Sequence, residues 1–453
     1  MRKRFAILFS TSAILLGILI LLVVVTHIAL NHLLLLLFLF LASLVGWGMT
    51  RWARREHTRA LLLPLLAVLT SLILGGIFAV ATDQQVWEAL AHVHENPWAA
   101  GQAILHSLLT TYKSWAEGSL GNPAKIQRGL EEWILTGDAR TLRFALRPWS
   151  EGLVNTVPYL FTGLAVAVGF AAGLFNIGAE GQFILGGLAA TWVGYSLQGI
   201  PFPLHMFLAL MAGALAGAFW GFIPGILRAK TGAHEVITTI MMNHIAFKVV
   251  TWLVNGPLEG PPGTARTPDI PMSARLPTFF PPPLRVHAGI VVGLIVVAIL
   301  AYLLRKTTWG FELRTVGQNP HAARYAGISI ARMTVVALTL SGLLAGMGGA
   351  IHAQGLIHNV SLGFSGGYGF DAIALALLGR NDPVGVLAAS LLFGVMRAGE
   401  TRLQSIAGVP REIISIVQVL VIIFIAAPDL VRSLYRIRDG EAPRVVSSEE
   451  GEI

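Results

Sequence analysis

The chain is a succession of long apolar stretches separated by short charged or glycine-rich segments. Apolar runs close to the ~20 residues that a helix needs to cross the hydrocarbon layer recur along it, for example over 5–30, 33–49, 60–81 and 205–227. Runs of this length indicate helices rather than barrel strands. The pattern predicts an all-α polytopic membrane protein with about ten to twelve transmembrane helices, some of them broken, around a central pathway.

The order of basic residues predicts which side of the membrane each connection faces. The positive-inside rule places the basic clusters at 2–4 and 51–59 in the cytoplasm, two crossings apart. The third span then exits, so residues 83–150 lie outside, where tryptophans alternate with polar stretches and indicate amphipathic helices at the interface. Counting on gives twelve spans, a cytoplasmic loop at 305–332 and two cytoplasmic termini.

Composition supports a membrane protein and excludes several other classes. The chain has 453 residues, of which 55% are hydrophobic and 12% charged, and its mean hydropathy is +0.69. Cysteine is absent, which excludes disulfides, thiolate catalysis and cysteine-based zinc sites. The net charge of +8 is dispersed near the ends of apolar runs, so it reflects topology and does not indicate nucleic acid.

Glycines four residues apart predict close packing between helices. Gly213, Gly217 and Gly221 form one such series, and Gly342 and Gly346 form another. Small residues at this spacing let helix backbones approach each other in lipid. We therefore expect these two segments to lie against neighbouring helices.

Two glycine-rich breaks are candidates for a solute pathway. The first, at 173–182, contains Asn176, Glu180 and Gln182, and the second, at 363–371, ends with Phe370 and Asp371. Polar groups and free backbone are tolerated at membrane depth only where they face protein or water, and paired breaks in two halves of a chain indicate a transport site. Composition alone also allows a pair of connecting loops outside the membrane.

Asn243 lies deeper, within an apolar run that begins near Glu235. A polar side chain at such a position faces either a pathway or a neighbouring helix, and both interpretations remain open. For Glu235 we expect a role in capping the start of that helix, where a carboxylate is favoured by the helix dipole.

The loop 305–332 predicts a protein–protein contact at the membrane surface. Pro320 can begin a short helix, alanines give that helix a face without bulk, and Gly327 can end it or allow close approach. An ordinary surface turn is the alternative. The candidate contact residues are Asn319, Pro320, His321, Ala322, Ala323, Tyr325 and Gly327.

No catalytic signature is present in the sequence. The chain contains neither a Gly-x-x-x-x-Gly-Lys-Ser/Thr phosphate loop nor a His-Glu-x-x-His zinc helix. It is therefore not expected to hydrolyse ATP by itself, and we predict no catalytic residue, no metal and no cofactor in this chain.

Four segments together resemble a known family. These are 176–182 (NIGAEGQ), 235–243 (EVITTIMMN), the loop 317–328 and 369–381 (GFDAIALALLGRN). In this order and spacing they resemble the nucleoside-type permease subunits of the branched-chain amino acid and ribose ABC importers, over residues 154–434. The loop is similar to the Glu-Ala-Ala-x-x-x-Gly loop by which such permeases engage their ATPases, with His321 in the place of Glu.

The resemblance implies an importer in the cell (inner) membrane that carries a nucleoside or a similar small polar solute. Its other members would be two ABC ATPases that bind ATP and Mg²⁺, a second permease of different sequence and an extracytoplasmic substrate-binding lipoprotein. The chain would divide into N-terminal transmembrane helices (1–82), an extracytoplasmic amphipathic region (83–150), a permease core with its coupling loop (151–434) and a cytoplasmic tail (435–453).

The main alternative is a secondary transporter driven by an ion gradient. Such a transporter would place a carboxylate or histidine relay within its spans. Glu180, Glu235 and Asp371 fall instead at breaks or helix ends, which disfavours that interpretation.

Overall fold

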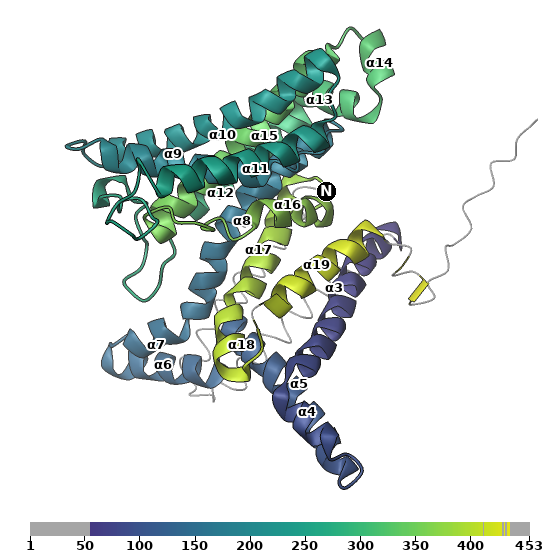
Figure 1. Cartoon of the computed structure of the whole chain (residues 1–453), viewed down its shortest axis with the longest axis vertical. Helices are drawn as coiled ribbons and strands as arrows, with labels where there is room; N and C mark the ends of the chain where they lie inside the picture. The colour runs from purple at the N-terminus through teal and green to yellow at the C-terminus, as the bar shows by residue number, and fades with distance from the viewer. Residues whose placement is uncertain (1–54, 411, 428–429, 431–432, 435–453) are drawn as a thin grey trace, which may run out of the picture. The chain divides into compact units, whose positions relative to one another are not determined.

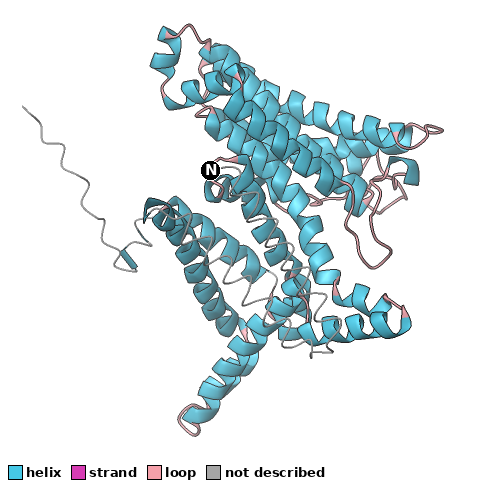
Figure 2. Cartoon of the chain, turned by 180° about the vertical axis from the view of Figure 1, so that it is seen from behind, coloured by secondary structure: helices cyan, strands magenta, loops and turns pink. Residues whose placement is uncertain are grey.

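A computed structural model describes residues 55–434, apart from 411, 428–429 and 431–432. The predicted spans 5–30 and 33–49 and the tail 435–453 lie outside the described residues. Within them the chain is helical (Figure 2), and the bridges Arg266–Ser361 and Thr278–His287 are isolated antiparallel pairs rather than strands of a sheet. This agrees with the all-α class expected from the apolar runs.

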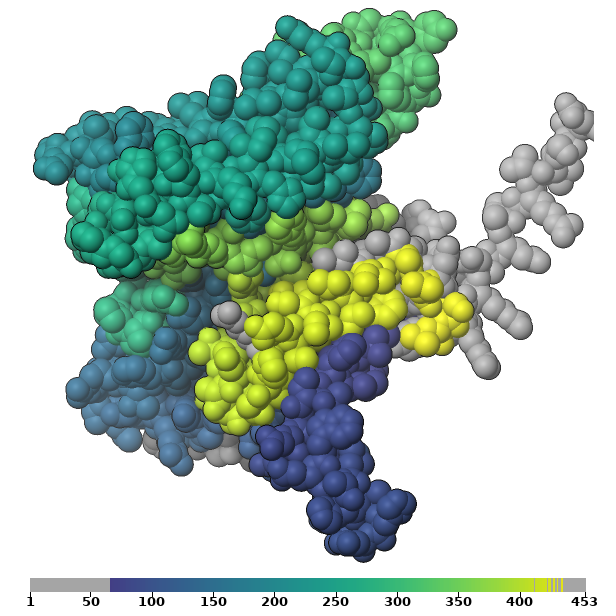
Figure 3. All heavy atoms as spheres, in the orientation of Figure 1, coloured from purple at the N-terminus to yellow at the C-terminus, as the bar shows by residue number. Residues whose placement is uncertain are grey.

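Five helices of the segment 147–426 pack closely with one another. In Figure 1, α9, α10, α11 and α15 (Ile330–His352) form a bundle with α8 beneath them, and Figure 3 shows the outer face of this bundle as a continuous surface of side chains. The helices of the first part of this segment are α8 (Arg147–Ala171), α9 (Ala179–Ser196), α10 (Leu204–Thr231), α11 (Glu235–Val254) and α12 (Gly289–Lys306).

The later part of the segment begins with two short helices in the charged loop and continues through a second set of membrane helices. A π-helical turn, η2 (Ala353–Ile357), ends α15. The elements are α13 (Thr308–Gln318), α14 (Pro320–Tyr325), α15 (Ile330–His352), α16 (Tyr368–Leu378), α17 (Pro383–Ala398), α18 (Glu400–Ala407) and α19 (Glu412–Ala426).

Six helices of the described chain are long and apolar enough to cross a membrane: α8, α10, α11, α12, α15 and α17 with its continuation α18. A seventh span results if the bent pair formed by α3 (Arg55–Thr82) and α4 (Gln84–Ala91) counts as one. The other expected spans are shorter or less apolar helices, such as α16 with 11 residues. An 11-residue helix is about half the length needed to cross, so the sequence count of twelve includes segments that cannot cross as single straight helices.

The region 83–150 is also helical, and its longest helix packs on the later membrane helices. It comprises α4, α5 (Pro97–Leu120), α6 (Pro123–Thr136) and α7 (Arg140–Ala145). On α5, the Trp115 indole donates a hydrogen bond to the Met396 carbonyl at 3.1 Å, and Glu117 forms an ion pair with Arg402. The region is therefore joined to α17 and α18 rather than detached from the membrane helices.

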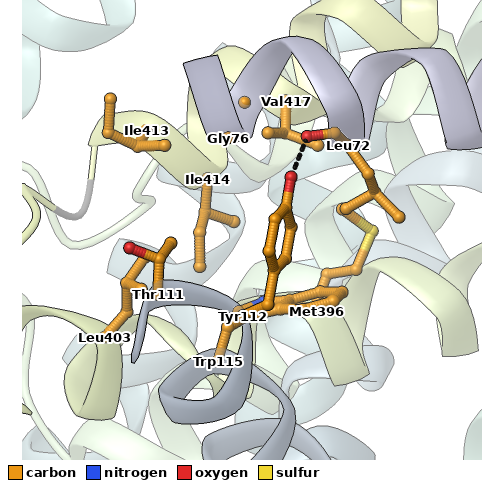
Figure 4. A pocket seen from close by; sticks show the side chains of 11 residues that line it. Leu72, Gly76, Thr111, Tyr112, Trp115, Met396, Leu403, Ile413, Ile414 and Val417 are labelled. Atoms are coloured by element: carbon orange, nitrogen blue, oxygen red, sulfur yellow. Dashed lines mark hydrogen bonds between the residues drawn. The ribbon is translucent and has the colours of Figure 1, made fainter. Parts of the chain in front are cut away.

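An apolar pocket lies between α5, α3 and the last helices of the chain (Figure 4). The Tyr112 hydroxyl donates to the Leu72 carbonyl at 2.7 Å beside it, and aliphatic side chains such as Ile413, Ile414 and Val417 form its wall. Since its lining offers few hydrogen-bonding groups, this pocket does not suit a polar solute.

The expected close packing of glycines joins α10 to α15. A methyl group added at Gly217 would lie 2.3 Å from the Gly342 carbonyl, and one at Gly346 would lie 2.4 Å from the Gly213 carbonyl. Both distances are far below van der Waals contact, so only glycine permits this backbone approach. Each glycine series therefore lies against a neighbouring helix, as predicted, and the structure shows that the two series face each other.

The loop between α11 and α12 packs on the end of α15. Ile270 donates its backbone N–H to the His358 carbonyl at 2.8 Å, and the buried Gln354 donates to the Ala274 carbonyl at 2.8 Å. His287, two residues before α12 begins, is also buried and accepts a hydrogen bond from the Gly289 N–H through Nδ1. An accepting Nδ1 requires a neutral imidazole ring.

We predict that Gly217→Leu destabilises the protein, because the larger side chain must separate α10 from α15. Overpacking of this kind costs about 1–3 kcal/mol or more. The apparent melting temperature in detergent should fall, while Gly101→Ala, at a helical glycine with open space around it, should leave it unchanged or raise it slightly. Equal melting temperatures for Gly217→Leu and the wild type would contradict the packing described here.

We predict that His287 makes the folded protein sensitive to acid. Burial lowers the pKa of His287 from 6.5 to about 4, with the nearby His358 and Arg285 acting in the same direction. Between these two values the unfolded chain binds a proton that the folded chain does not, so the free energy of unfolding falls as pH falls, by about 3 kcal/mol over the whole interval.

The measurement is thermal unfolding of the wild type and of His287→Asn from pH 7 to pH 4. The wild type should lose more stability over this range than the variant, which has no titrating group at this position. Parallel curves for the two proteins would rule out this role of His287.

Candidate functional site

The first break, between α8 and α9, is held by the side chain of Asn176. Its Nδ2 donates to Gln182 Oε1 at 2.9 Å and to the Ser341 hydroxyl at 2.7 Å, and its Oδ1 accepts the Gly178 N–H at 3.0 Å. The Ser341 hydroxyl in turn donates to the Ala165 carbonyl at 2.5 Å. Asn176 therefore joins the break to α9, α15 and α8 at once.

Asn243 fixes the same break from α11. Its Oδ1 accepts the Gly181 N–H at 2.9 Å, and its Nδ2 donates to the Ile177 carbonyl at 2.9 Å. Gly181 has no room for a side chain, because an added methyl would lie 2.9 Å from Asn243 Oδ1. The carboxamide thus satisfies a donor and an acceptor of the interrupted backbone, the interhelical role that the sequence left open.

Glu180 connects the first break to the second. Its Oε2 accepts the Gly369 N–H at 2.7 Å. Gly369 belongs to the start of α16, where the free N–H groups of a helix favour a negative charge. The two glycine-rich breaks, almost 190 residues apart in sequence, therefore meet through a carboxylate at a helix N-terminus.

Asp371 belongs to a second polar cluster on α8, α16 and α17. Its Oδ2 accepts the Tyr159 hydroxyl at 3.0 Å and lies 3.8 Å from Arg397 Nη1. Arg397 donates to the Tyr159 oxygen at 2.8 Å and to the Gly366 carbonyl at 3.0 Å. Its guanidinium also lies 4.3 Å from the ring centroid of Tyr368, a cation–π contact.

The predicted pathway residues separate into two groups by exposure. Asn176, Glu180, Gln182 and Asn243 are at most 2% exposed and use their polar atoms on other residues of the chain. In contrast, Phe370 is 43% exposed. The side chains of Asp371 and Arg397 are each 21% exposed, so they can meet a solute.

Sequence reasoning missed Tyr159, Tyr368 and Arg397. Arg397 lies at the end of an apolar run, where basic residues were interpreted as markers of topology. In the structure it pairs with Asp371. A possible signal was that Asp371 and Arg397 are opposite charges on successive apolar segments, which would each be costly in lipid without a partner.

Glu235 does not have the capping role expected from the sequence. It is the first residue of α11 and makes no side-chain cap, and its Oε2 lies 3.3 Å from Arg228 Nε at the end of α10. The carboxylate therefore joins two helix ends through an ion pair.

The expected short helix of the charged loop is α14. Asn319 caps it by accepting the N–H groups of His321 and Ala322, each at 3.0 Å, and Pro320 is its first residue. After the helix, Gly327 has φ of +77° with open space around its Cα. Helix α14 thus begins at Pro320 and ends shortly before Gly327, the two residues from which its ends were predicted.

Most of α14 is exposed, and one alanine attaches it to the chain. Tyr325 is 94% exposed, whereas Ala323 is fully buried and packs in a cluster with Val316 and Met333. Ala323 therefore cannot itself touch a partner, which corrects its inclusion among the contact residues. Figure 1 shows α14 projecting from the end of α13 and α15.

A glycine contact connects the charged loop to the first break. A methyl on Gly317, in α13, would lie 2.3 Å from the Ala171 carbonyl, and one on Gly173 would lie 3.0 Å from Gly317 Cα. Displacement of α13 would therefore press directly on the segment that leads to Asn176.

The membrane helices, their paired breaks and the exposed loop helix fit a transport protein, and comparison with known proteins identifies its class. Residues 149–426 match the family described as "Branched-chain amino acid transport system / permease component". The chain belongs to this permease family. No solved structure matches it.

Three curated relatives of this permease illustrate the similarity. The guanosine ABC transporter permease protein NupP of Bacillus subtilis (strain 168) is 42% identical over 62% of this chain and 82% of its own. The glucose ABC transporter permease protein TsgB13 of Haloferax volcanii is 38% identical over 67% and 81%. The nucleoside ABC transporter permease protein NupB of Lactococcus lactis subsp. cremoris is 33% identical over 82% and 92%.

We predict that Asn243→Leu destabilises the permease, because it leaves the Gly181 N–H and the Ile177 carbonyl without their partner. An unsatisfied buried group costs about 1–3 kcal/mol. The apparent melting temperature should drop clearly for this variant. It should change little for Asn255→Ala, since Asn255 is exposed and bonds only within its own helix end. A stable Asn243→Leu variant would show that the break does not depend on this side chain.

Proposed function

We propose that this permease is the membrane subunit of an ATP-binding cassette importer, that it carries a nucleoside or a similar small polar solute, and that separate ATPases drive it by docking on α14. The observation that carries the proposal is the exposed helix with Tyr325 at 94% exposure, connected to the membrane break through Gly317 and Gly173. A helix that transmits movement from an ATPase must be accessible on the surface and must also be connected to the transport region, and α14 meets both conditions.

The substrate class rests on the relatives and on the chemistry of the site. Relatives of the permease carry the words guanosine, nucleoside and glucose in their names. All three describe uncharged, polar, hydrogen-bonding solutes. The partly exposed Asp371–Arg397 pair offers hydrogen bonds without a net charge, and Phe370, which precedes Asp371 in α16, has a partly exposed aromatic ring.

The coupling step follows from rigid contacts. ATP and Mg²⁺ bound by the ATPases would close them and move α14. Ala323 passes this movement to α13 and α15 through Val316 and Met333. From α13 the contact of Gly317 with Gly173 passes the movement to the first break. The membrane helices on either side of Asn176 then move relative to each other, and the pathway opens alternately to the two sides of the membrane.

The remaining partners and the orientation belong to the same proposal. Loop 305–332 and both termini face the cytoplasm of the cell (inner) membrane. The α11–α12 loop faces outward, toward a substrate-binding lipoprotein. A second permease of different sequence completes the pathway.

We predict that Gly327→Arg leaves the permease inserted but lowers recovery of its ATPase at least tenfold, equivalent to about 1.4 kcal/mol of binding free energy. The large side chain blocks the approach to α14. It meets no atom of the chain within 4 Å of its Cβ, but the φ of +77° at Gly327 strains any residue other than glycine. The measurement is copurification of the ATPase with the tagged chain in mild detergent.

The matched variant is Gly327→Asn. Asparagine tolerates positive φ better than other residues, so this variant tests backbone conformation without much bulk and should retain the ATPase. Normal recovery of the ATPase with Gly327→Arg would remove α14 as the docking site. Loss with both variants would indicate a need for glycine rather than a blocked surface.

A further inference from the structure

Helix α11 packs through one face on α9 and α10. Its buried residues recur every three or four positions, as at Thr239, Asn243, Ala246 and Val250. Asn243 bonds to the first break, and Val250 packs in a cluster with Ile184 of α9. The opposite face of this membrane helix is exposed, so its residues indicate what surrounds it.

The exposed face of α11 changes character along its length. Ile237 and Met241, in the first half, are 62% and 51% exposed. In the second half the exposed residues include His244, Lys248 and Thr251, and their spacing of four and three residues places them on one side of the helix. In the proposed orientation, this polar half leads to the outer surface of the membrane.

Depth excludes hydrocarbon as the surroundings of this polar half. At 1.5 Å per residue, Lys248 is about 9 Å and His244 about 15 Å from the outer end of α11 at Val254. A lysine can extend its ammonium group to the membrane surface, but the short histidine side chain cannot do so from the middle of the membrane. Neither side chain has a polar partner among the residues that the structure describes, and an unpaired polar group is costly in lipid.

Helix α12 provides a contrast within the same chain. It has 18 residues against the 20 of α11, and its exposed positions include Val291, Leu294, Ile295 and Ile299. Its basic residues, at 305 and 306, are confined to the last turn. An apolar face of this kind suits lipid, so the polar half of α11 has different surroundings.

Water fits this face of α11 better than a packed protein surface. A lysine and a histidine buried against another subunit would lose hydration, and each would need a specific partner. In water they need none, and the polar positions continue through Thr251 to the exposed Asn255 after the helix. Because Asn243 joins the packed face of α11 to the first break, movement of that break would also move the exposed face.

We propose that His244, Lys248 and Thr251 line the outer half of the water-filled pathway, and that Lys248 binds the solute as it passes. This inference rests on the proposed function and deepens it by naming residues of the pathway. The ammonium group of lysine is a donor with three N–H bonds, which suits the hydroxyl and carbonyl oxygens of an uncharged nucleoside or sugar. The second permease supplies the opposite wall.

The first test is the reactivity of single cysteines toward MTSES, an anionic thiol reagent that does not enter lipid. The complete transporter is labelled in nanodiscs, and the mass of this chain, which has no cysteine of its own, is then measured. The variants are His244→Cys and Lys248→Cys. Each should react at least about tenfold faster than its control, because a thiol in apolar surroundings forms little of the reactive thiolate.

The controls lie on α12 at matched depth. Ile299→Cys and Ile295→Cys are about 15 Å and 9 Å from the outer end of that helix, the depths of His244 and Lys248. Ile299 and Ile295 are also exposed, at 51% and 53%. Equal rates on the two helices would overturn the pathway assignment, because lipid or the second permease would then cover α11.

The second test is uptake of labelled guanosine by cells that carry the transporter. Lys248→Met has a side chain of similar length without a donor and should lower uptake at least about tenfold, as expected for the loss of a hydrogen bond from a charged group. Lys248→Arg keeps charged donors and should retain most of the uptake. Full uptake with Lys248→Met, at an unchanged amount of transporter in the membrane, would overturn the contact with the solute.

The outcomes separate this inference from the proposed function. If Lys248→Cys does not assemble, the comparison of His244→Cys with Ile299→Cys decides the pathway assignment. Guanosine uptake by the wild type together with equal labelling rates would reject the pathway residues and still support the importer. Absence of any nucleoside uptake by the wild type, together with fast labelling of His244→Cys, would reject the nucleoside assignment and support the pathway.

Discussion

A membrane helix can be interrupted only if other groups replace the backbone hydrogen bonds that the interruption removes. Water is not there to do so, and each unpaired N–H or carbonyl in hydrocarbon costs several kcal/mol. In this permease Asn176 and Asn243 satisfy the break before α9, and Glu180 satisfies the start of α16. The arrangement of α8, α9, α11, α15 and α16 depends on these three side chains.

Glycine contacts determine which helices of this region must move together. The backbones of α10 and α15 approach so closely through Gly217, Gly342 and Gly346 that the two helices must move together. Gly317 in turn lies against Gly173 at the beginning of the first break. A displacement of α14 would therefore be passed to the first break. This segment is held by hydrogen bonds, which can change partners, whereas α10 and α15 are held together by tight packing.

Much of the fold could be predicted because it depends on local patterns. Apolar run length indicated the helices, the glycine series indicated close packing against neighbouring helices, and Pro320 and Gly327 marked the ends of α14. Span count was less predictable, because α16 and α19 are apolar but short. The packing of helix α5 was also not predictable, since its sequence does not show that small residues such as Ser107 and Ser114 are buried.

The candidate site was harder to predict because its chemistry is assembled from distant segments. Tyr159 meets Asp371 across 212 residues and Arg397 across 238, and no local spacing connects them. The sequence also identified Asn176, Gln182 and Asn243 as polar residues at depth, but their types alone could not distinguish a solute contact from a helix-to-helix bond. Their burial of 98% or more shows the latter in this structure.

The most direct test of the account is crosslinking from α14, which the chain allows because it contains no cysteine. A single cysteine replacing Tyr325 would carry a photoreactive benzophenone, and the products formed in native membranes would be identified by mass spectrometry. The account predicts an adduct with a phosphate-loop ATPase from Tyr325→Cys and none from Trp98→Cys, another largely exposed position, on α5, at 75% exposure. An ATPase adduct absent from Tyr325→Cys in membranes that support uptake would contradict it.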